Sequence, residues 1–276
     1  MFKTQKINNA IVTPLQLKNQ FRPDQIYGYE FCSQPYATWL LCAKSRQGKG
    51  TAMYHILNHT IDPLMKTNVV IFSSTIHRDP LWEKTISLLE RKKCNVSCYS
   101  HFLTEGRKKD NILTELINTM DENDDKDDKQ ESDEEEDEVP FGSSKKIKEK
   151  KNKKPTKISS KWLFIFDDLP MQDMRNDCFN FVMRNRHYKC KVILSVQYLN
   201  MLLPSVRKNL TNVILFKSFS DEKLHSIYND LDIEIPFDQF VDLYHFATEK
   251  QYSFLQYDVH NGVWIKNFNE KIIISL

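Results

Sequence analysis

Short apolar runs alternate with amphipathic segments along much of this chain of 276 residues. Runs rich in Val, Ile and Phe predict strands, and apolar residues spaced three or four positions apart predict helices. Predicted strands cover residues 67–74, 95–99, 162–166, 191–196 and 212–216, and predicted helices cover residues 81–90, 111–120, 175–184 and 220–230. Strands separated by helices are typical of parallel βαβ units, so we expect an α/β fold with a mostly parallel central sheet. Two further runs, 252–258 and 262–265, flank an Asn-Gly pair and predict a terminal hairpin.

An earlier apolar run, from Tyr36 to Ala43, ends at a loop that carries Gly48-Lys49-Gly50-Thr51, and a helix-compatible segment follows at residues 52–58. This order of strand, loop and helix is the context of a phosphate-binding P-loop. The loop N–H groups would hold the phosphates of ATP, and Lys49 would reach the β and γ oxygens. Two positions depart from the usual pattern. Ala43 stands where the first glycine is usual, and Gly50 stands where Ser or Thr is usual, which leaves Thr51 to serve the metal. Taken alone, the motif also fits a lysine-containing surface turn.

A second chemical motif closes the predicted strand at 162–166, where four apolar residues lead into Asp167 and Asp168. This is the pattern of a Walker B strand. Asp167 would hold Mg²⁺, directly or through water, because a hard dication prefers oxygen ligands. Asp168 would orient or deprotonate the attacking water. A strand that ends in a polar Asp-Asp turn is the alternative, and the P-loop upstream makes it the weaker one.

Gln197 ends the next predicted strand, where a polar side chain could sense the γ-phosphate or the attacking water. An exposed glutamine at a strand end is the alternative. Hydrolysis of a γ-phosphoryl group also needs positive charge beyond the lysine, usually from an arginine finger. Several arginines lie nearby in the sequence, and the sequence does not select one of them.

Charge is distributed unevenly along the chain, although its formal net charge is only +2. Residues 121–138 hold 13 acidic residues and two lysines, and residues 145–157 hold eight lysines and one glutamate. Such blocks cannot bury apolar area, so we expect a disordered insertion at 121–160. The remainder is mildly basic, which fits a nucleic-acid partner without requiring one.

Three other features narrow the class of protein. No apolar run approaches the ~18 residues of a membrane helix, so we expect no membrane span. The N-terminus lacks the apolar stretch of a signal peptide, so we expect an intracellular protein. The six cysteines are dispersed, and only Cys94 and Cys98 are close together without nearby His or Cys to complete a zinc site. We therefore expect reduced, mostly buried thiols.

The segment 70–82, the Asp167-Asp168 pair, the stretch from Arg186 through Gln197 to Asn209, and the closing residues 252–268 occur in one order. In this combination the chain resembles the DNA-packaging ATPases of virophages, Polinton/Maverick elements and nucleocytoplasmic large DNA viruses, in the FtsK–HerA branch of P-loop motors. The resemblance implies a RecA-like sheet, hydrolysis of ATP with Mg²⁺, a homo-oligomeric ring, and translocation of double-stranded DNA into a capsid. It also implies capsid or portal-vertex partners, and a location in the host-cell viral factory or the virion.

The resemblance further implies a role for each motif residue. Lys49 and Thr51 would belong to Walker A, Asp167 and Asp168 to Walker B, Gln197 would be the sensor, and Arg207 would be a finger acting in trans, with Arg186 as the second candidate. We expect an N-terminal extension at 1–34 and an ATPase domain at 35–276, interrupted by the insertion. Two other functions stay open: a P-loop small-molecule kinase, suggested by Gly48-Lys49-Gly50-Thr51, and a regulatory relic that binds nucleotide weakly, suggested by Ala43.

Overall fold

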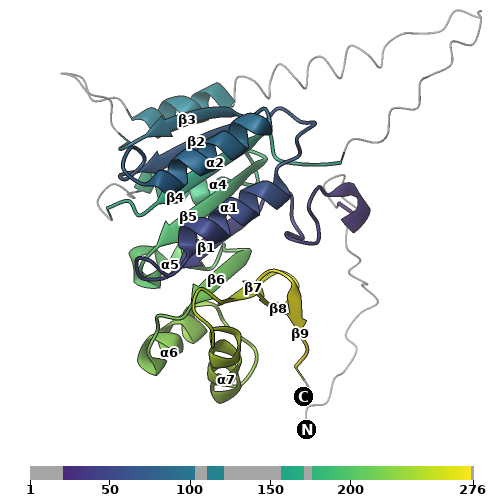
Figure 1. Cartoon of the computed structure of the whole chain (residues 1–276), viewed down its shortest axis with the longest axis vertical. Coiled ribbons are helices and arrows are strands. Elements are labelled where there is room, and N and C mark those ends of the chain that lie inside the picture. The colour runs from purple at the N-terminus through teal and green to yellow at the C-terminus, as the bar shows by residue number, and fades with distance from the viewer. Residues whose placement is uncertain (1–20, 103–110, 121–156, 171–175, 275–276) are drawn as a thin grey trace, which may run out of the picture.

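A nine-stranded sheet forms the centre of the protein in the computed structural model, which describes residues 21–102, 111–120, 157–170 and 176–274 (Figure 1). The strand order is β3-β2-β4-β5-β1-β6-β7-β8-β9. Neighbouring strands are parallel from β3 to β6 and antiparallel from β6 to β9. The strands are β1 (Thr38–Cys42), β2 (Asn68–Ser73), β3 (Asn95–Tyr99), β4 (Trp162–Asp167), β5 (Cys190–Val196), β6 (Asn212–Phe216), β7 (Phe254–Asp258), β8 (Val263–Lys266) and β9 (Glu270–Ile272).

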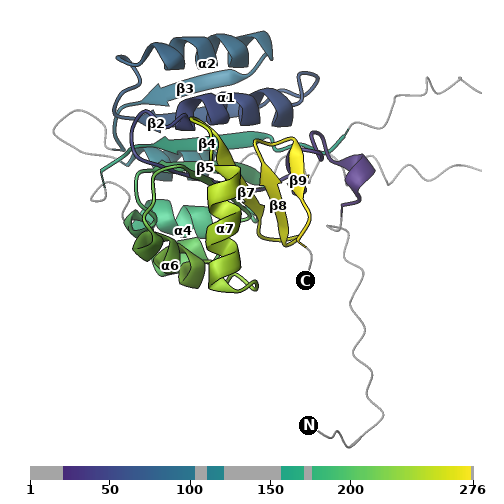
Figure 2. The same ribbon diagram turned by 60° about the horizontal axis from the view of Figure 1, so that its bottom comes forward.

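Helices cover both faces of this sheet (Figure 2). On one face lie α1 and α2, and on the other lie α4, α6 and α7. Residues 112–120 are also helical, and short helical turns occur at η1 and η2. The helices are η1 (Pro23–Gln25), α1 (Lys49–Thr60), α2 (Pro80–Arg91), α4 (Asn176–Arg184), η2 (Leu199–Met201), α5 (Pro204–Arg207), α6 (Asp221–Asp230) and α7 (Phe237–Ala247).

Side-chain alternation along the strands divides the core into two layers. In β4, Leu163 and Ile165 belong to the cluster on the side of α1 and α2, whereas Phe164 and Phe166 belong to the cluster on the other side. The ring of Phe164 packs edge-on against Phe181 of α4, with centroids 4.6 Å apart. A strand buried on both faces is apolar at most positions, which explains the nearly continuous hydrophobic runs of the sequence.

The predicted α/β fold with its mostly parallel sheet is confirmed. The predicted terminal hairpin corresponds to the antiparallel pair β7–β8, with Leu255 opposite Lys266. The elements that were not predicted include the helix α7, the edge strand β9 and the short helix α5. Among the described residues, no helix combines the length and the apolar character needed to cross a membrane.

The last residues of the predicted insertion, 158–160, contact the described part of the domain. Ile158 forms a β-bridge with Ile26, and the Tyr27 N–H donates to the Ile158 carbonyl at 3.0 Å. Ser160 is also buried. Residues 158–160 therefore pack on the folded domain, where Ile158 forms backbone hydrogen bonds with the segment before β1. Residues 121–156 lie outside the described residues, as do residues 1–20, so the proposed domain division stays a prediction.

Candidate nucleotide site

The loop after β1 turns sharply into α1, which begins at Lys49. The turn depends on Gly48, whose φ of 103° is a conformation that L side chains rarely adopt. Ala43, at the first position of the loop, is buried and is not among the residues with positive φ. A methyl group at that position therefore does not strain the loop.

The second departure from the usual motif, Gly50, has a packing reason. A Cβ atom built on Gly50 would lie 2.3 Å from Cδ2 of Leu81, in the first turn of α2. Helix α2 is fixed there by Asp79, whose carboxylate accepts a hydrogen bond from the Leu81 N–H at 2.9 Å, and by Pro80 at the first helical position. Leu81 thus occupies the space in which a Ser or Thr side chain would stand. The nearest hydroxyl in the sequence, Thr51, is exposed and lines the same cavity as Lys49.

The Lys49 ammonium group joins three strands of the sheet. Its Nζ donates to the Ala43 carbonyl at 3.0 Å, to Oδ1 of Asp168 at 3.0 Å, and to the Val196 carbonyl at 3.4 Å. The residue is only 7% exposed. The ends of β1, β4 and β5 therefore converge on one buried cation, which brings the loop after β1 and the Asp-Asp pair at the end of β4 to one point.

Asp167 and Asp168 differ in their surroundings. Asp167 ends β4 opposite Ser73, whose hydroxyl donates to its carboxylate at 3.2 Å. Burial raises the pKa of Asp167, the neighbouring Asp168 charge adds to that rise, and the Lys49 charge and the Ser73 hydroxyl oppose it. Asp168 has φ of 43°, and its N–H donates to the Ser195 carbonyl at 3.0 Å, which turns its side chain back toward Lys49.

These groups line a cavity of about 570 Å³ at the carboxyl ends of the parallel strands. Its donor set suits Mg-ATP: a helix N-terminus and a lysine for phosphate, and carboxylate and hydroxyl oxygens for a hard dication. Several polar and aromatic residues of this region, among them Ser73, Thr75, Asp79 and Tyr252, were not predicted from the sequence. Only Ser73 had a signal there, because it lies at the end of the predicted strand 67–74. The cavity is lined by Ser45, Arg46, Gly48, Lys49, Gly50, Thr51, Met53, Thr75, Asp79, Leu81, Trp82, Thr85, Asp167, Asp168 and Tyr252.

Comparison with known proteins identifies the fold. No family model and no curated protein matches the sequence. The chain superposes on the DNA-packaging ATPase B204 from Sulfolobus Turreted Icosahedral Virus with a TM-score of 0.51, at 16% identity, over 88% of this chain and 100% of that one. The chain has the fold of a genome-packaging NTPase. The B204 protein of Sulfolobus turreted icosahedral virus 2 gives a TM-score of 0.51 at 18% identity in its sulfate complex, over 88% of this chain and 100% of that one. Its AMPPCP complex gives 0.50 at 17% identity, over 84% and 97%.

Gln197 and Arg207 do not line the cavity. Gln197 directly follows β5, which lies between β1 and β4, and its role as a sensor stays a prediction. The Arg207 side chain is 14% exposed and forms an ion pair with Asp230 at 2.6 Å. Its Nε also donates to the Leu202 carbonyl at 2.9 Å. A role for Arg207 in trans therefore stays a prediction, and it would require release of this ion pair.

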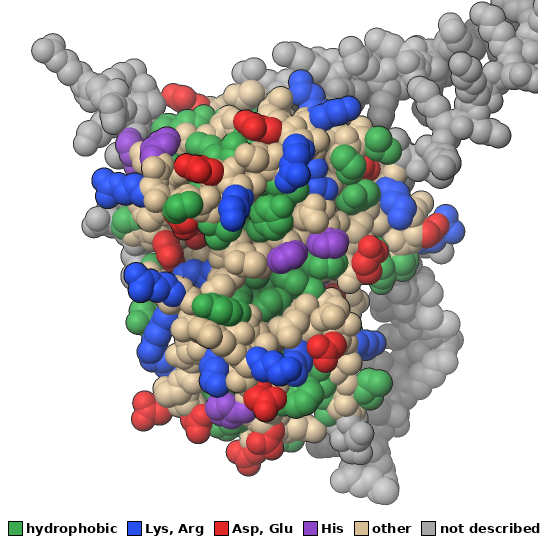
Figure 3. All heavy atoms as spheres, viewed as in Figure 1, with side chains coloured by type: hydrophobic (Ala, Val, Ile, Leu, Met, Phe, Trp, Pro, Cys, Tyr) green, Lys and Arg blue, Asp and Glu red, His purple; other side chains and the backbone are tan. Residues whose placement is uncertain are grey.

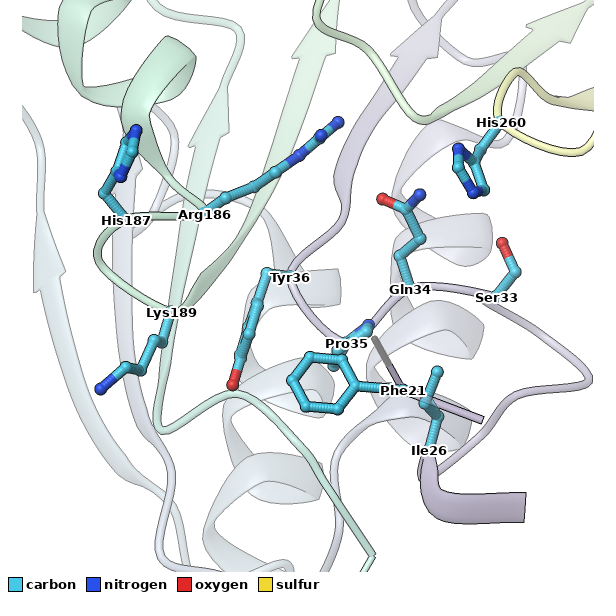
Figure 4. Close-up of a pocket in the computed structure, with 10 residues that line it drawn as sticks. All are labelled: Phe21, Ile26, Ser33, Gln34, Pro35, Tyr36, Arg186, His187, Lys189 and His260. Carbon is cyan, nitrogen blue, oxygen red and sulfur yellow. The ribbon is translucent and has the colours of Figure 1, made fainter. Parts of the chain in front are cut away.

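A second hollow of about 710 Å³ lies at the opposite, amino-terminal end of the parallel strands (Figure 4). Arg186, His187 and Lys189 contribute to it from the turn before β5, and His260 contributes from the turn between β7 and β8. Figure 4 shows that the side chains of His187 and Lys189 diverge from that of Arg186. The hollow is basic, but its cations do not converge on a single point. On the face that carries α1 and α2, acidic and basic side chains are interspersed (Figure 3).

Proposed function

We propose that this protein is an ATP-hydrolysing motor that packages double-stranded DNA into a capsid. The fold of the B204 packaging NTPases supports this proposal, and so does the cavity at the end of the P-loop strand. The solved B204 structures include complexes with AMPPCP and with AMP, which are nucleotide ligands of those proteins.

The observation that carries the proposal is the contact between Lys49 and Asp168. The two residues are 119 positions apart in the sequence, and Lys49 Nζ lies 3.0 Å from the Asp168 carboxylate. A lysine in an ordinary surface turn would not be buried against the Asp-Asp pair at the end of another strand. The pairing is what a P-loop and a Walker B strand need in order to act on one phosphate chain.

Each residue then has a separate task. The N–H groups around Gly48 bind phosphate oxygens, and Lys49 moves from Asp168 to the β and γ oxygens. Asp167 and Thr51 hold Mg²⁺, which neutralises phosphate charge when it is bound. Asp168, once free of Lys49, orients the attacking water and accepts its proton. Gln197 senses the state of the phosphate beside β5.

The proposed motor works as a homo-oligomeric ring on duplex DNA, with a capsid or portal-vertex protein as its further partner. Lys49 and Arg46 already line the cavity, and a ring would add a further cation that faces the phosphates from a neighbouring subunit. Arg207 is the proposed donor, and Arg186, which is exposed, is the second candidate. Hydrolysis at each interface would move the DNA-contacting segments along the phosphate backbone.

Phosphate release from ATP, measured with and without duplex DNA, tests the proposal. We expect release that rises with duplex DNA and with protein concentration. We expect no release from Lys49→Ala at any DNA concentration. Transfer of the phosphoryl group to a nucleotide or metabolite would select a small-molecule kinase instead. A folded protein that binds no ATP would select the regulatory relic.

A further inference from the structure

Tyr252 occupies an unusual place beside the P-loop. It is the third residue of a turn between α7 and β7, closed by a hydrogen bond from the Ser253 N–H to the Lys250 carbonyl at 3.2 Å. Its φ is 67°, a conformation that favours Gly or Asn at this position of a turn. Its side chain is nevertheless a large ring, and the residue is 57% exposed. Neither the turn nor the core explains an aromatic side chain there.

The ring lies directly against the phosphate-binding loop. A Cβ atom built on Gly48 would lie 3.6 Å from Cδ1 and 3.7 Å from Cβ of Tyr252, and 3.4 Å from Phe216 at the end of β6. Tyr252 also lines the cavity that contains Lys49 and Asp167. The ring thus forms part of the wall of the nucleotide site and stays open to solvent on its free side.

The order of the strands sets the direction in which a bound nucleotide extends. The P-loop strand β1 lies between β5 and β6, and the Walker B strand β4 lies beyond β5. A γ-phosphate must point toward Asp168, on the β4 side. The nucleoside of an extended nucleotide then leaves the loop on the other side, over the ends of β6 and β7, where Tyr252 stands.

We propose that Tyr252 is the platform on which the purine base of the nucleotide stacks. This inference rests on the proposed function, because it assigns a residue to the same site. An aromatic face binds a base through its π surface and makes no hydrogen bonds that identify the base. The ring therefore favours purines over the smaller pyrimidines and discriminates poorly between ATP and GTP.

Binding of ATP and of inorganic tripolyphosphate to the full chain with Mg²⁺, measured by isothermal titration, tests the platform. Tyr252→Asn removes the ring but keeps a residue that tolerates positive φ, so the turn is preserved. Loss of one stacked base corresponds to a rise of about 5- to 150-fold in the Kd for ATP. The Kd for tripolyphosphate, which has no base, should stay within about twofold. Tyr252→Phe should bind ATP like the parent, and so should Tyr29→Ala, which removes another exposed tyrosine.

Each other outcome contradicts the platform. Equal weakening of both ligands by Tyr252→Asn would show that the ring supports the loop and does not hold the base. An unchanged Kd for ATP would show that the base lies elsewhere, while the proposed ATPase would stand. A parental protein that binds neither ligand would overturn the proposed function, and the platform with it.

Discussion

Replacing Asp168 by asparagine keeps the size of the side chain and removes the charge that faces Lys49. The Lys49 side chain is 8% exposed and the Asp168 side chain 30%. Breaking a fully buried ion pair costs about 3–5 kcal/mol. The cost is smaller here, because Asp168 is partly solvated and the ammonium keeps the carbonyls of Ala43 and Val196. We expect the free energy of unfolding of ligand-free Asp168→Asn to fall by about 1–2 kcal/mol.

The same substitution should affect nucleotide binding and turnover in opposite ways. Lys49 has to leave Asp168 before it can reach the phosphates, so the loss of this partner removes a competitor for the lysine. We expect the Kd for ATP of Asp168→Asn to be equal to or lower than the parental value. We expect kcat to fall by about 10²- to 10⁴-fold, because the amide cannot accept the proton of the attacking water.

Three measurements check this set of expectations: denaturant unfolding without ligand, isothermal titration with ATP, and phosphate release. Lys49→Ala is the matched control, and it should lose tight ATP binding and turnover together. Parental hydrolysis by Lys49→Ala would refute the P-loop assignment. If Asp168→Asn hydrolysed ATP at the parental rate, Asp168 would not have the proposed role. If its free energy of unfolding were unchanged, the Lys49–Asp168 ion pair would not stabilise the folded protein.

Other substitutions test features farther from the phosphates. Arg207→Ala should lower the free energy of unfolding by about 1–2 kcal/mol, because Asp230 loses its partner. The variant should bind ATP normally, yet it should lower the ATPase rate of mixed rings by more than its fraction of the subunits. Arg186→Ala, which changes an exposed arginine, is the control, and an equal loss of stability in it would contradict the ion-pair reasoning. Burial lowers the pKa of Lys191 from 10.5, so between the lowered pKa and 10.5 the unfolded state binds more protons than the folded state. The free energy of unfolding should therefore rise with pH in this range through Lys191. Lys191→Met should lose this contribution, and an equal slope of the free energy of unfolding against pH in the two proteins would refute it. Replacing residues 121–156 by a short Gly-Ser linker should leave basal ATPase activity, the melting transition and the salt dependence of DNA binding nearly unchanged; a variant that fails to fold would place this segment in the core.

The sequence predicted those parts of the fold that have a local signal. The continuous apolar runs identified β2, β4, β5 and β6 because strands buried on both faces are apolar at most positions, with exceptions such as Lys191 and Ser195 of β5. Helix α7 also had a signal, since Phe237, Phe240, Tyr244 and Ala247 follow helical spacing. This helix was therefore predictable, although it was not predicted. The order of the strands had no local signal, because it depends on crossovers between distant segments.

The candidate site was predictable to a similar extent. Lys49, Asp167 and Asp168 were identified because phosphate and metal chemistry restricts the residue type at each position. Tyr252 could not be identified, because its closeness to Gly48 arises only when β7 pairs with β6. The partner of Arg207 was equally hidden, since Asp230 ends a helix that lies in a later part of the sequence.

The contact of Leu81 with Gly50 makes the residue after the P-loop lysine part of a helix–helix interface. A phosphate loop is often treated as a sequence motif that is independent of its surroundings, yet in this chain Leu81 of α2 restricts which side chain fits at one position of the loop. Restoring the usual ending by Gly50→Ser would place a Cβ atom against Cδ2 of Leu81, so the Leu81 side chain would have to turn aside to admit it. A search for P-loops that demands Ser or Thr directly after the lysine would therefore pass over this chain, in which Gly50 follows Lys49.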